Sequence, residues 1–473
     1  MRVLGKLKPE RVFYYFEDLC AIPHGSGNTD RISEYCVAFA EAHGLSWQRD
    51  EWNNVIIGKD ATVGYEQCPT VILQGHLDMV CEKDPDCPLN METDGLEIAT
   101  DGVDVWAKGT TLGGDDGIAV AMALAILEDD TLPHPPLEVL FTTDEETGMY
   151  GAAGLDPDRV RGRVLINVDS EQEGVLTVGC AGGARAQLTV PIDRKPSQAP
   201  CVQVKVTGLI GGHSGVEIHN GRLNANIVMG QFLQSLSMPF RIVSMEGGNK
   251  DNAIPRECTC VLAVEQDITA VAQAFAKQHA VATDADLQLI VSAAPCAKTA
   301  LTAEDSRRVA DFLCAVPNGV IAMSSAIPTL VQTSLNLGVL LLEESDLKAT
   351  FAVRSSLQSD KETLLKRLEK TATDFGGTYE SHGHYPAWEY REQSPLRDTM
   401  TAVYRRLYGK DATVEIIHAG LECGLLSEKL SGLDAVSLGP DMQDIHTARE
   451  RLSVASTART YAYLCETLKA MGE

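Results

Sequence analysis

Imidazole and carboxylate side chains stand at or just past the ends of four apolar, strand-like runs of this chain. The runs and the polar residues that follow them are Val71–Gly75 with His76, Leu137–Phe141 with Asp144, Glu145 and Glu146, Val164–Val168 with Asp169, and Ala435–Leu438 with His446. In open α/β sheets the ligand crevice lies outside the carboxyl ends of the strands. We therefore expect these side chains to converge in space, where they could hold metal ions.

Taken alone, each of these motifs has an ordinary structural explanation. In His76-Leu77-Asp78 the aspartate can accept the second ring N–H of a metal-bound histidine, but the same residues also suit a turn after a strand. Asp115, in Gly113-Gly114-Asp115-Asp116-Gly117, stands where an N-cap would, at the start of an apolar helix. The flanking glycines, however, permit the close approach that a carboxylate bridging two cations needs.

The acidic triplet after Phe141 is the most informative piece. Adjacent carboxylates at a buried strand end repel each other unless a cation lies between them, although a solvated acidic turn would also explain the triplet. One carboxylate could bind a metal while its neighbour accepts a proton from water. With His76, Asp115, Asp169 and His446 the donor set suits zinc, with cobalt or manganese possible, and it predicts a metallohydrolase.

Several longer motifs together carry a resemblance to a known family; they are Gln74–Val80, Thr110–Gly117, Phe141–Gly148, Gly211–Gly215, Asn252–Glu257 and His418–Gly424. They resemble the cocatalytic zinc metallopeptidases, the family that includes aminoacyl-histidine dipeptidases, carboxypeptidase G and aminoacylase. The match is best with the aminoacyl-histidine dipeptidase (carnosinase-like) branch. The resemblance spans essentially the whole chain. Asp116 stands where many relatives have Asn, and His446-Thr447-Ala448 where they often have His-Ser-Pro.

The resemblance implies a role for each matching residue. His76 and Asp169 would hold one zinc ion, Glu146 and His446 would hold the second, and Asp115 would bridge both ions. The resemblance also implies a cis peptide bond directly after Asp115. Glu145 would be the general base and Asp78 the partner of His76. His213 would donate to the oxyanion, from its own or a neighbouring subunit. The substrate contacts implied are Asn252, Arg354, His418 and Gly420.

The expected reaction is hydrolysis of small unblocked peptides, with Xaa-His dipeptides such as β-alanyl-histidine as the expected substrates. An N-acyl amino acid amidohydrolase or a carboxypeptidase of the same superfamily is the first alternative. A catalytically inactive metal- or peptide-binding relative is the second, although no ligand or base residue is missing. The resemblance also favours a homodimer formed through an inserted domain.

The elements that must position these residues indicate an α/β protein of two domains. Helical patterns at Pro9–Ala21, Asp30–His43 and Gly114–Asp129 alternate with buried strands, which predicts a mostly parallel or mixed sheet flanked by helices. Amphipathic strands from about residue 187 predict an inserted α+β lid. The predicted boundaries are 1–186 and 389–473 for the catalytic domain and 187–388 for the lid, with Tyr379–Pro386 as a return linker.

Composition narrows the partners and the compartment. The chain has 473 residues, and 66 acidic against 40 basic residues give a formal charge of −26, which argues against nucleic acid or anionic membranes as partners. Its 13 cysteines are dispersed without a C-x-x-C pair, which favours a reducing compartment. No apolar run reaches the length of about 18 residues that spans a bilayer, so we expect a cytoplasmic protein.

Overall fold

The computed structural model describes residues 2–325 and 327–472, which divide into two compact units. The first unit contains the chain up to Gly179, Tyr390–Ile416 and the chain from Leu421 onward, and the second contains Cys180–Glu389 and Ile417–Gly420. Each unit encloses a hydrophobic core of its own. The role of the second unit as a lid stays a prediction.

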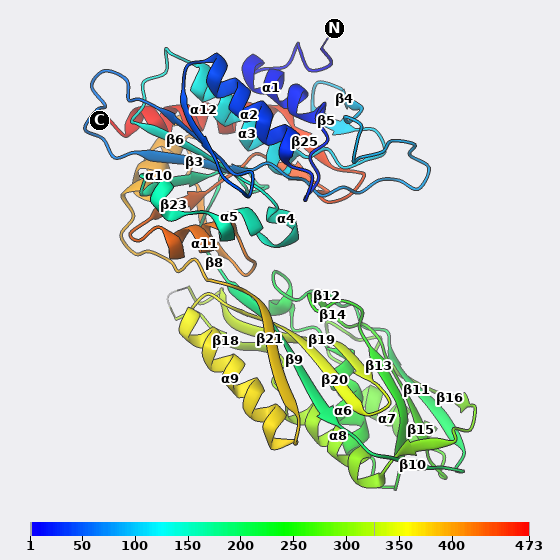
Figure 1. Ribbon diagram of the computed structural model, residues 1–473. Helices are drawn as coiled ribbons and strands as arrows, with labels where there is room; N and C mark the ends of the chain where they lie inside the picture. The colour runs from blue at the N-terminus through cyan, green and yellow to red at the C-terminus, as the bar shows by residue number, and fades with distance from the viewer. Residues whose placement is uncertain (1, 326, 473) are drawn as a thin grey trace. The chain divides into compact units, whose positions relative to one another are not determined.

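The first unit is built on an eight-stranded mixed sheet (Figure 1). Its strands, in spatial order, are β1 (Ser46–Arg49), β2 (Val55–Lys59), β6 (Leu137–Thr142), β3 (Val71–His76), β7 (Val164–Asn167), β23 (Asp434–Ser437), β8 (Val175–Cys180) and β22 (Thr413–Ile417). The four central strands, β6 to β23, run parallel to one another. Their carboxyl ends therefore meet at one edge of the sheet.

Helices flank this sheet, and a small four-stranded sheet completes the unit. In Figure 1, α1, α2 and α3 lie together on one side of β3 and β6. The helices are α1 (Glu10–Cys20), α2 (Asp30–Ala42), α3 (Gly114–Glu128), α4 (Glu145–Gly148), α5 (Tyr150–Gly154), η1 (Pro157–Arg159), α10 (Pro395–Tyr408), α11 (Glu422–Lys429) and α12 (Val454–Ala470). The small sheet runs β24 (Met442–Gln443), β25 (Arg451–Ser453), β5 (Asp104–Ala107), β4 (Ile98–Thr100).

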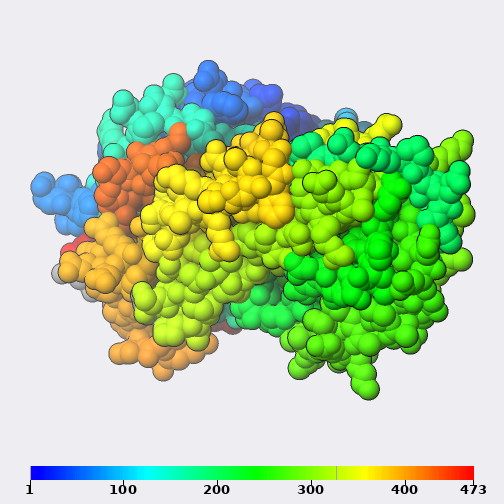
Figure 2. Space-filling view, turned by 90° about the horizontal axis from the view of Figure 1, so that it is seen from below, coloured from blue at the N-terminus to red at the C-terminus, as the bar shows by residue number. Residues whose placement is uncertain are grey.

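The second unit is an antiparallel sheet with helices packed on it. Its strands are β16 (Gln288–Ala294), β11 (Cys201–Thr207), β15 (Cys258–Ala263), β13 (Arg241–Gly247), β19 (Val331–Leu342), β20 (Asp346–Ser355), β9 (Gly182–Pro191) and β21 (Thr378–Tyr385), with β18 (Gly319–Met323) beside β19. Its helices are α6 (Ala225–Ser235), α7 (Thr269–His279), α8 (Ala303–Ala315) and α9 (Gln358–Asp374), with η2 (Ile218–Asn220). Two short pairs, β12 (Gly212–His213) with β14 (Ala253–Ile254) and β10 (Arg194–Pro196) with β17 (Thr299–Leu301), complete it. In Figure 2, chain segments from the start of this unit (green) and from its end (yellow) lie side by side on the surface.

The helices and strands predicted from hydrophobic periodicity are confirmed, but the predicted return linker is wrong. Residues 379–385 belong to β21, which pairs with β9 at the edge of the second sheet. Glycine and proline near its end suggested a loop, whereas Tyr379 and alternating exposure along the segment suit an edge strand. Pairing with β9 therefore overrides the local turn signals.

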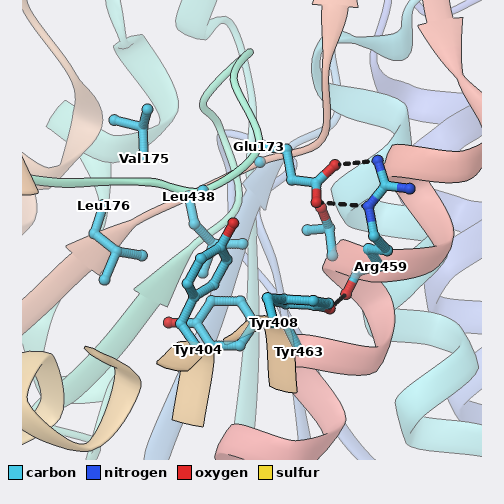
Figure 3. A pocket seen from close by; sticks show the side chains of 11 residues that line it. Glu173, Val175, Leu176, Tyr404, Tyr408, Leu438, Arg459 and Tyr463 are labelled. Carbon is cyan, nitrogen blue, oxygen red and sulfur yellow. Dashed lines mark hydrogen bonds and ion pairs between the residues drawn. The ribbon is translucent and has the colours of Figure 1, made fainter. Parts of the chain in front are cut away.

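The size of a cavity in the first unit limits what it could bind. A cavity of about 10 Å³ in the first unit has room for about one water, so it cannot hold a peptide. Beside it Arg459 pairs with Glu173 through two contacts of 2.7 and 2.6 Å, and the Tyr408 hydroxyl donates to the Arg459 carbonyl (Figure 3).

Among residues 2–325 and 327–472, the helices are too short or too polar to cross a membrane.

Helix α3 offers a direct test of the packing in the first unit. Its side chains are buried almost all round, and Leu124 has no exposed surface. We expect Leu124→Ala to lower the free energy of unfolding by about 2–5 kcal/mol, because the surrounding side chains cannot fully fill the space that the shorter side chain leaves. Val103, which is 66% exposed, provides the control, since Val103→Ala should leave stability nearly unchanged. Urea denaturation monitored by tryptophan fluorescence measures both; equal midpoints for the two variants would contradict this packing.

Candidate metal centre

Strand register brings the predicted ligands of the first unit to one edge of its sheet. His76 is the last residue of β3 and lies beside Thr142, the last residue of β6, while Gln74 lies beside Asn167 at the end of β7. Residues just past these strands therefore start from neighbouring points. Because the strands are parallel and buried, distant parts of the sequence supply side chains to the same small volume.

Asp115 contacts both histidines, one with each carboxylate oxygen. Its Oδ1 lies 3.0 Å from His76 Nε2, and its Oδ2 lies 3.3 Å from His446 Nε2. Asp169 Oδ1 is 3.8 Å from His76 Nε2, and Glu146 Oε1 is 2.7 Å from His446 Nε2. This arrangement has the form of two neighbouring donor sets joined by one carboxylate.

Three overlapping groups of possible donor atoms describe the same cluster. In each group the atoms lie within 4.8 Å of one another. The groups are His76 with Asp116 and Asp169, His76 with Glu145 and Glu146, and Asp115 with Glu146 and His446. All five predicted metal ligands therefore lie in one cluster, with Glu145 and Asp116 beside them.

Asp116 has a structural task that sets it apart from Asp115. Its Oδ2 accepts the backbone N–H of His76 at 3.1 Å, so its carboxylate is turned toward strand β3. A side chain at Gly75 would collide with it, since an added Cβ would lie 2.5 Å from that oxygen. The Asp115–Asp116 peptide is cis, as the resemblance implies. Asp115 is thus the better candidate for the bridging carboxylate.

The ring of His76 is oriented by Asp78 in a way the sequence did not fully predict. His76 Nδ1 lies 2.9 Å from the backbone carbonyl of Asp78 and 3.4 Å from its carboxylate. Donation from Nδ1 to the carbonyl leaves Nε2 free for a metal. The Asp78 carboxylate instead accepts the Ser26 hydroxyl at 2.7 Å and the N–H groups of Glu145 and Glu146 at 3.0 and 3.3 Å. Asp78 therefore holds the His76 ring through its carbonyl and the backbone of Glu145 and Glu146 through its carboxylate.

The electrostatics of the cluster fit a metal site. Burial, followed by repulsion from Asp116, raises the pKa of Asp169 well above its usual range, and Asp169 Oδ2 is buried without a hydrogen-bond partner among the described residues. Burial likewise raises the pKa of Glu145 to about 8, with Glu422 and Glu146 adding to the effect. Such a set of close carboxylates is stabilised by cations. The donors present, two imidazoles and three carboxylates, suit zinc and related divalent ions.

The predicted substrate contacts, Asn252, Arg354, His418 and Gly420, lie with His213 in the second unit. Three of these five meet around Gly215, where an added Cβ would lie 2.5 Å from the His418 carbonyl, 2.9 Å from His213 Cε1 and 3.1 Å from Arg354 Nε. The Asn252 carbonyl accepts the N–H of the neighbouring Ser214 at 2.9 Å, and Gly420 lies against the ring of Tyr385.

A buried polar layer beneath the cluster was missed by the sequence analysis. The Glu422 carboxylate accepts Gln74 Nε2 at 2.7 Å and the Thr142 hydroxyl at 2.6 Å. Gln74 in turn accepts Asn167 Nδ2 at 2.6 Å. Gln74 and Asn167 each stand two residues before a predicted ligand, so period-two alternation could have identified them, whereas the burial of Glu422 has no sequence signal.

Comparison with known proteins is consistent with this geometry. Residues 72–470 match the model of peptidase family M20/M25/M40. The cytosol non-specific dipeptidase of Escherichia coli strain K12 is 37% identical over 480 residues, covering 99% of each chain. The structure of aminoacylhistidine dipeptidase from Vibrio alginolyticus matches with a TM-score of 0.92 and 35% identity, covering 99% of this chain and 98% of that one.

The chain therefore belongs to peptidase family M20/M25/M40, and it is a hydrolase that acts on peptide bonds. The family resemblance drawn from the motifs and the predicted mixed α/β fold are both confirmed. Aminopeptidase PepT from Bacillus cereus, at 15% identity and a TM-score of 0.58, shares the fold.

Asp78 provides a test of how the cluster is held. We expect Asp78→Asn to weaken metal binding by about 10- to 100-fold, because an amide N–H₂ would face backbone N–H donors. Asp101→Asn is the matched control, since the Asp101 carboxylate also accepts two backbone N–H groups but is exposed. Zinc titration by calorimetry compares the variants. Wild-type affinity in Asp78→Asn would contradict this role.

Proposed function

We propose that this protein is a dimetal dipeptidase that hydrolyses small unblocked peptides, with Xaa-His dipeptides such as β-alanyl-histidine as its principal substrates. The observation that carries the proposal is the meeting of His76, Asp115 and His446, with Asp115 presenting one oxygen to each imidazole. The specificity is supported by the aminoacylhistidine dipeptidase of Vibrio alginolyticus, which is similar along the whole chain.

The proposed cofactor is a pair of zinc ions, with cobalt or manganese as substitutes. His76 and Asp169 would hold one ion, Glu146 and His446 the other, and Asp115 both. When bound, the ions would polarise the scissile carbonyl and lower the pKa of the attacking water. The chain's own side chains would perform the remaining steps.

Glu145 is the proposed general base. Its carboxylate lies beside the donor atoms of His76 and Glu146. The backbone N–H of Glu145 donates to the Asp78 carboxylate, and this hydrogen bond fixes the position of the residue. Its carboxylate would accept the proton of the attacking water and pass it to the departing amine nitrogen. Nearby cations would favour the ionised form that this role requires.

His213 is the proposed oxyanion donor, and its hydrogen bonds support that role. Its Nδ1 lies 3.2 Å from the backbone nitrogens of both Gly215 and Val216, which donate to it. The ring proton must therefore be on Nε2, where it can be donated to a developing negative charge. Burial, and then the charge of Arg354, lowers the pKa of His213 and keeps the ring neutral.

Arg354 is the proposed partner of the substrate carboxylate. Its Nη1 donates to the Tyr385 hydroxyl at 2.8 Å, whereas its Nε has no partner among the described residues. His418, whose Nε2 lies 2.7 Å from the Ser334 hydroxyl, is close by, and burial followed by the Arg354 charge lowers its pKa to about 3. A neutral His418 leaves the guanidinium free to attract an anion.

We further propose a cytoplasmic homodimer formed through the second unit. The name of the Escherichia coli relative, a cytosol dipeptidase, supports the compartment. Light scattering coupled to gel filtration would test the assembly. A mass of about twice that of the 51.0 kDa chain is expected.

Replacing Glu145 tests the proposed mechanism. We expect Glu145→Gln to keep its metal while kcat falls by about 10²- to 10⁴-fold, because no base remains to accept the proton. Asp144→Asn serves as the control, because the neighbouring Asp144 carboxylate accepts the Gly27 N–H at 2.6 Å and has no part in the proposed proton transfer. It should keep most of the activity. Metal analysis and steady-state kinetics measure both variants. Near-full activity in Glu145→Gln would remove it from this role.

A substrate panel tests the proposed specificity. β-Alanyl-histidine, other Xaa-His dipeptides, dipeptides without histidine, tripeptides and N-acetyl amino acids would be compared on zinc-, cobalt- and manganese-loaded enzyme. We expect kcat/KM to be highest for the Xaa-His dipeptides. A preference for N-acetyl amino acids would instead support an amidohydrolase, and equal rates on all dipeptides would support a non-specific dipeptidase.

A further inference from the structure

Glu450 is a buried carboxylate that the proposed mechanism does not use. Its side chain is 3% exposed and accepts three backbone N–H groups from one short segment. Leu112 N and Gly113 N lie 2.7 and 3.2 Å from Oε2, and Gly114 N lies 2.8 Å from Oε1. These three residues directly precede Asp115, so Glu450 fixes the backbone that presents the bridging carboxylate.

The backbone of Glu450 belongs to the loop that presents His446. This loop joins β24 to β25, whose pairing of Met442 with Leu452 closes it. Within it, the Glu450 N–H donates to the Thr447 carbonyl at 3.1 Å, and the Thr447 hydroxyl donates to the Asp444 carbonyl at 2.7 Å. His446 has a left-handed backbone, with φ of 58°. The position of His446 therefore depends on how this loop is held.

One side chain thus connects the two segments that supply the Asp115 and His446 donors. The segments are more than 330 residues apart in sequence, yet Asp115 Oδ2 and His446 Nε2 lie 3.3 Å apart. Three charge-assisted hydrogen bonds to one buried carboxylate restrict the relative movement of the two segments. A cation between these donors requires their separation to be held closely, because ligand geometry determines affinity.

We propose that Glu450 is a positioning residue that sets the separation of Asp115 and His446 and so controls one of the two metal positions, the one formed with Glu146. The inference rests on the proposed dimetal function. It predicts an unequal effect, because Asp115 would serve both positions but His446 only this one, while the ring of His76 is held separately by the Asp78 carbonyl.

The test is zinc titration of Glu450→Gln by calorimetry, together with steady-state kinetics. An amide would keep one acceptor oxygen but place an N–H₂ group against a backbone N–H donor. We expect the zinc ion held with Glu146 and His446 to bind about 10- to 100-fold more weakly, and the other ion, which shares only Asp115 with it, to be weakened much less. At limiting zinc kcat should fall, and excess zinc should restore it with KM unchanged.

Two further variants make the test specific. Arg449→Gln is the matched control, because the neighbouring exposed Arg449 pairs only with Asp84 among the contacts described for its side chain. Gly114→Ala approaches the same contact from the other side, since an added Cβ would lie 3.1 Å from Glu450 Oε1. It should reproduce the unequal loss, and it carries the test if Glu450→Gln does not fold. Combined with Glu450→Gln it should add little, because both changes break one interaction.

The outcomes separate this inference from the proposed function. If the wild-type protein does not bind two zinc ions, the dimetal proposal itself fails. If the wild type binds two and Glu450→Gln and Gly114→Ala also bind two with unchanged affinity, the positioning role is wrong. Equal weakening of both ions with a lower melting temperature would show a general structural role and would likewise overturn it.

Discussion

Repulsion among buried carboxylates is the constraint on which the rest of this structure depends. Asp115, Glu146 and Asp169 share a small volume with Asp116 and Glu145, and burial removes the water that would otherwise screen their charges. Two imidazoles alone offset only part of this charge, and only when they are protonated. Divalent cations satisfy the same donors without protonation, so the arrangement that is unfavourable for a bare protein is suited to a metal centre.

The protein holds this arrangement by fixing backbone as well as side chains. Parallel strands bring His76 and the segments after β6 and β7 to one edge of the sheet. Asp78 then holds the N–H groups of Glu145 and Glu146, and Glu450 holds those before Asp115. Each supporting carboxylate accepts main-chain N–H groups, which leaves the side chains of the proposed ligands available for a cation.

Much of this could be predicted from the sequence, because the informative residues are local to strong patterns. The strand-end positions of His76 and Asp169 follow from apolar runs, and the glycines around Asp115 mark a tight approach. Tyr379–Pro386 was predicted wrongly, because its pairing with β9 is a long-range contact that overrides local turn residues. The roles of Glu422 and Glu450 were missed because their partners are remote in sequence and are mostly backbone atoms or a neutral side chain, which leave no motif.

The central claim is that two cations share Asp115 at the edge of the first sheet. Anomalous diffraction from crystals of the zinc-loaded protein, collected on both sides of the zinc absorption edge, tests it most directly. The account predicts two anomalous peaks in this cluster, one contacted by His76, Asp115 and Asp169 and the other by Asp115, Glu146 and His446. A single peak, or peaks away from Asp115, would contradict it.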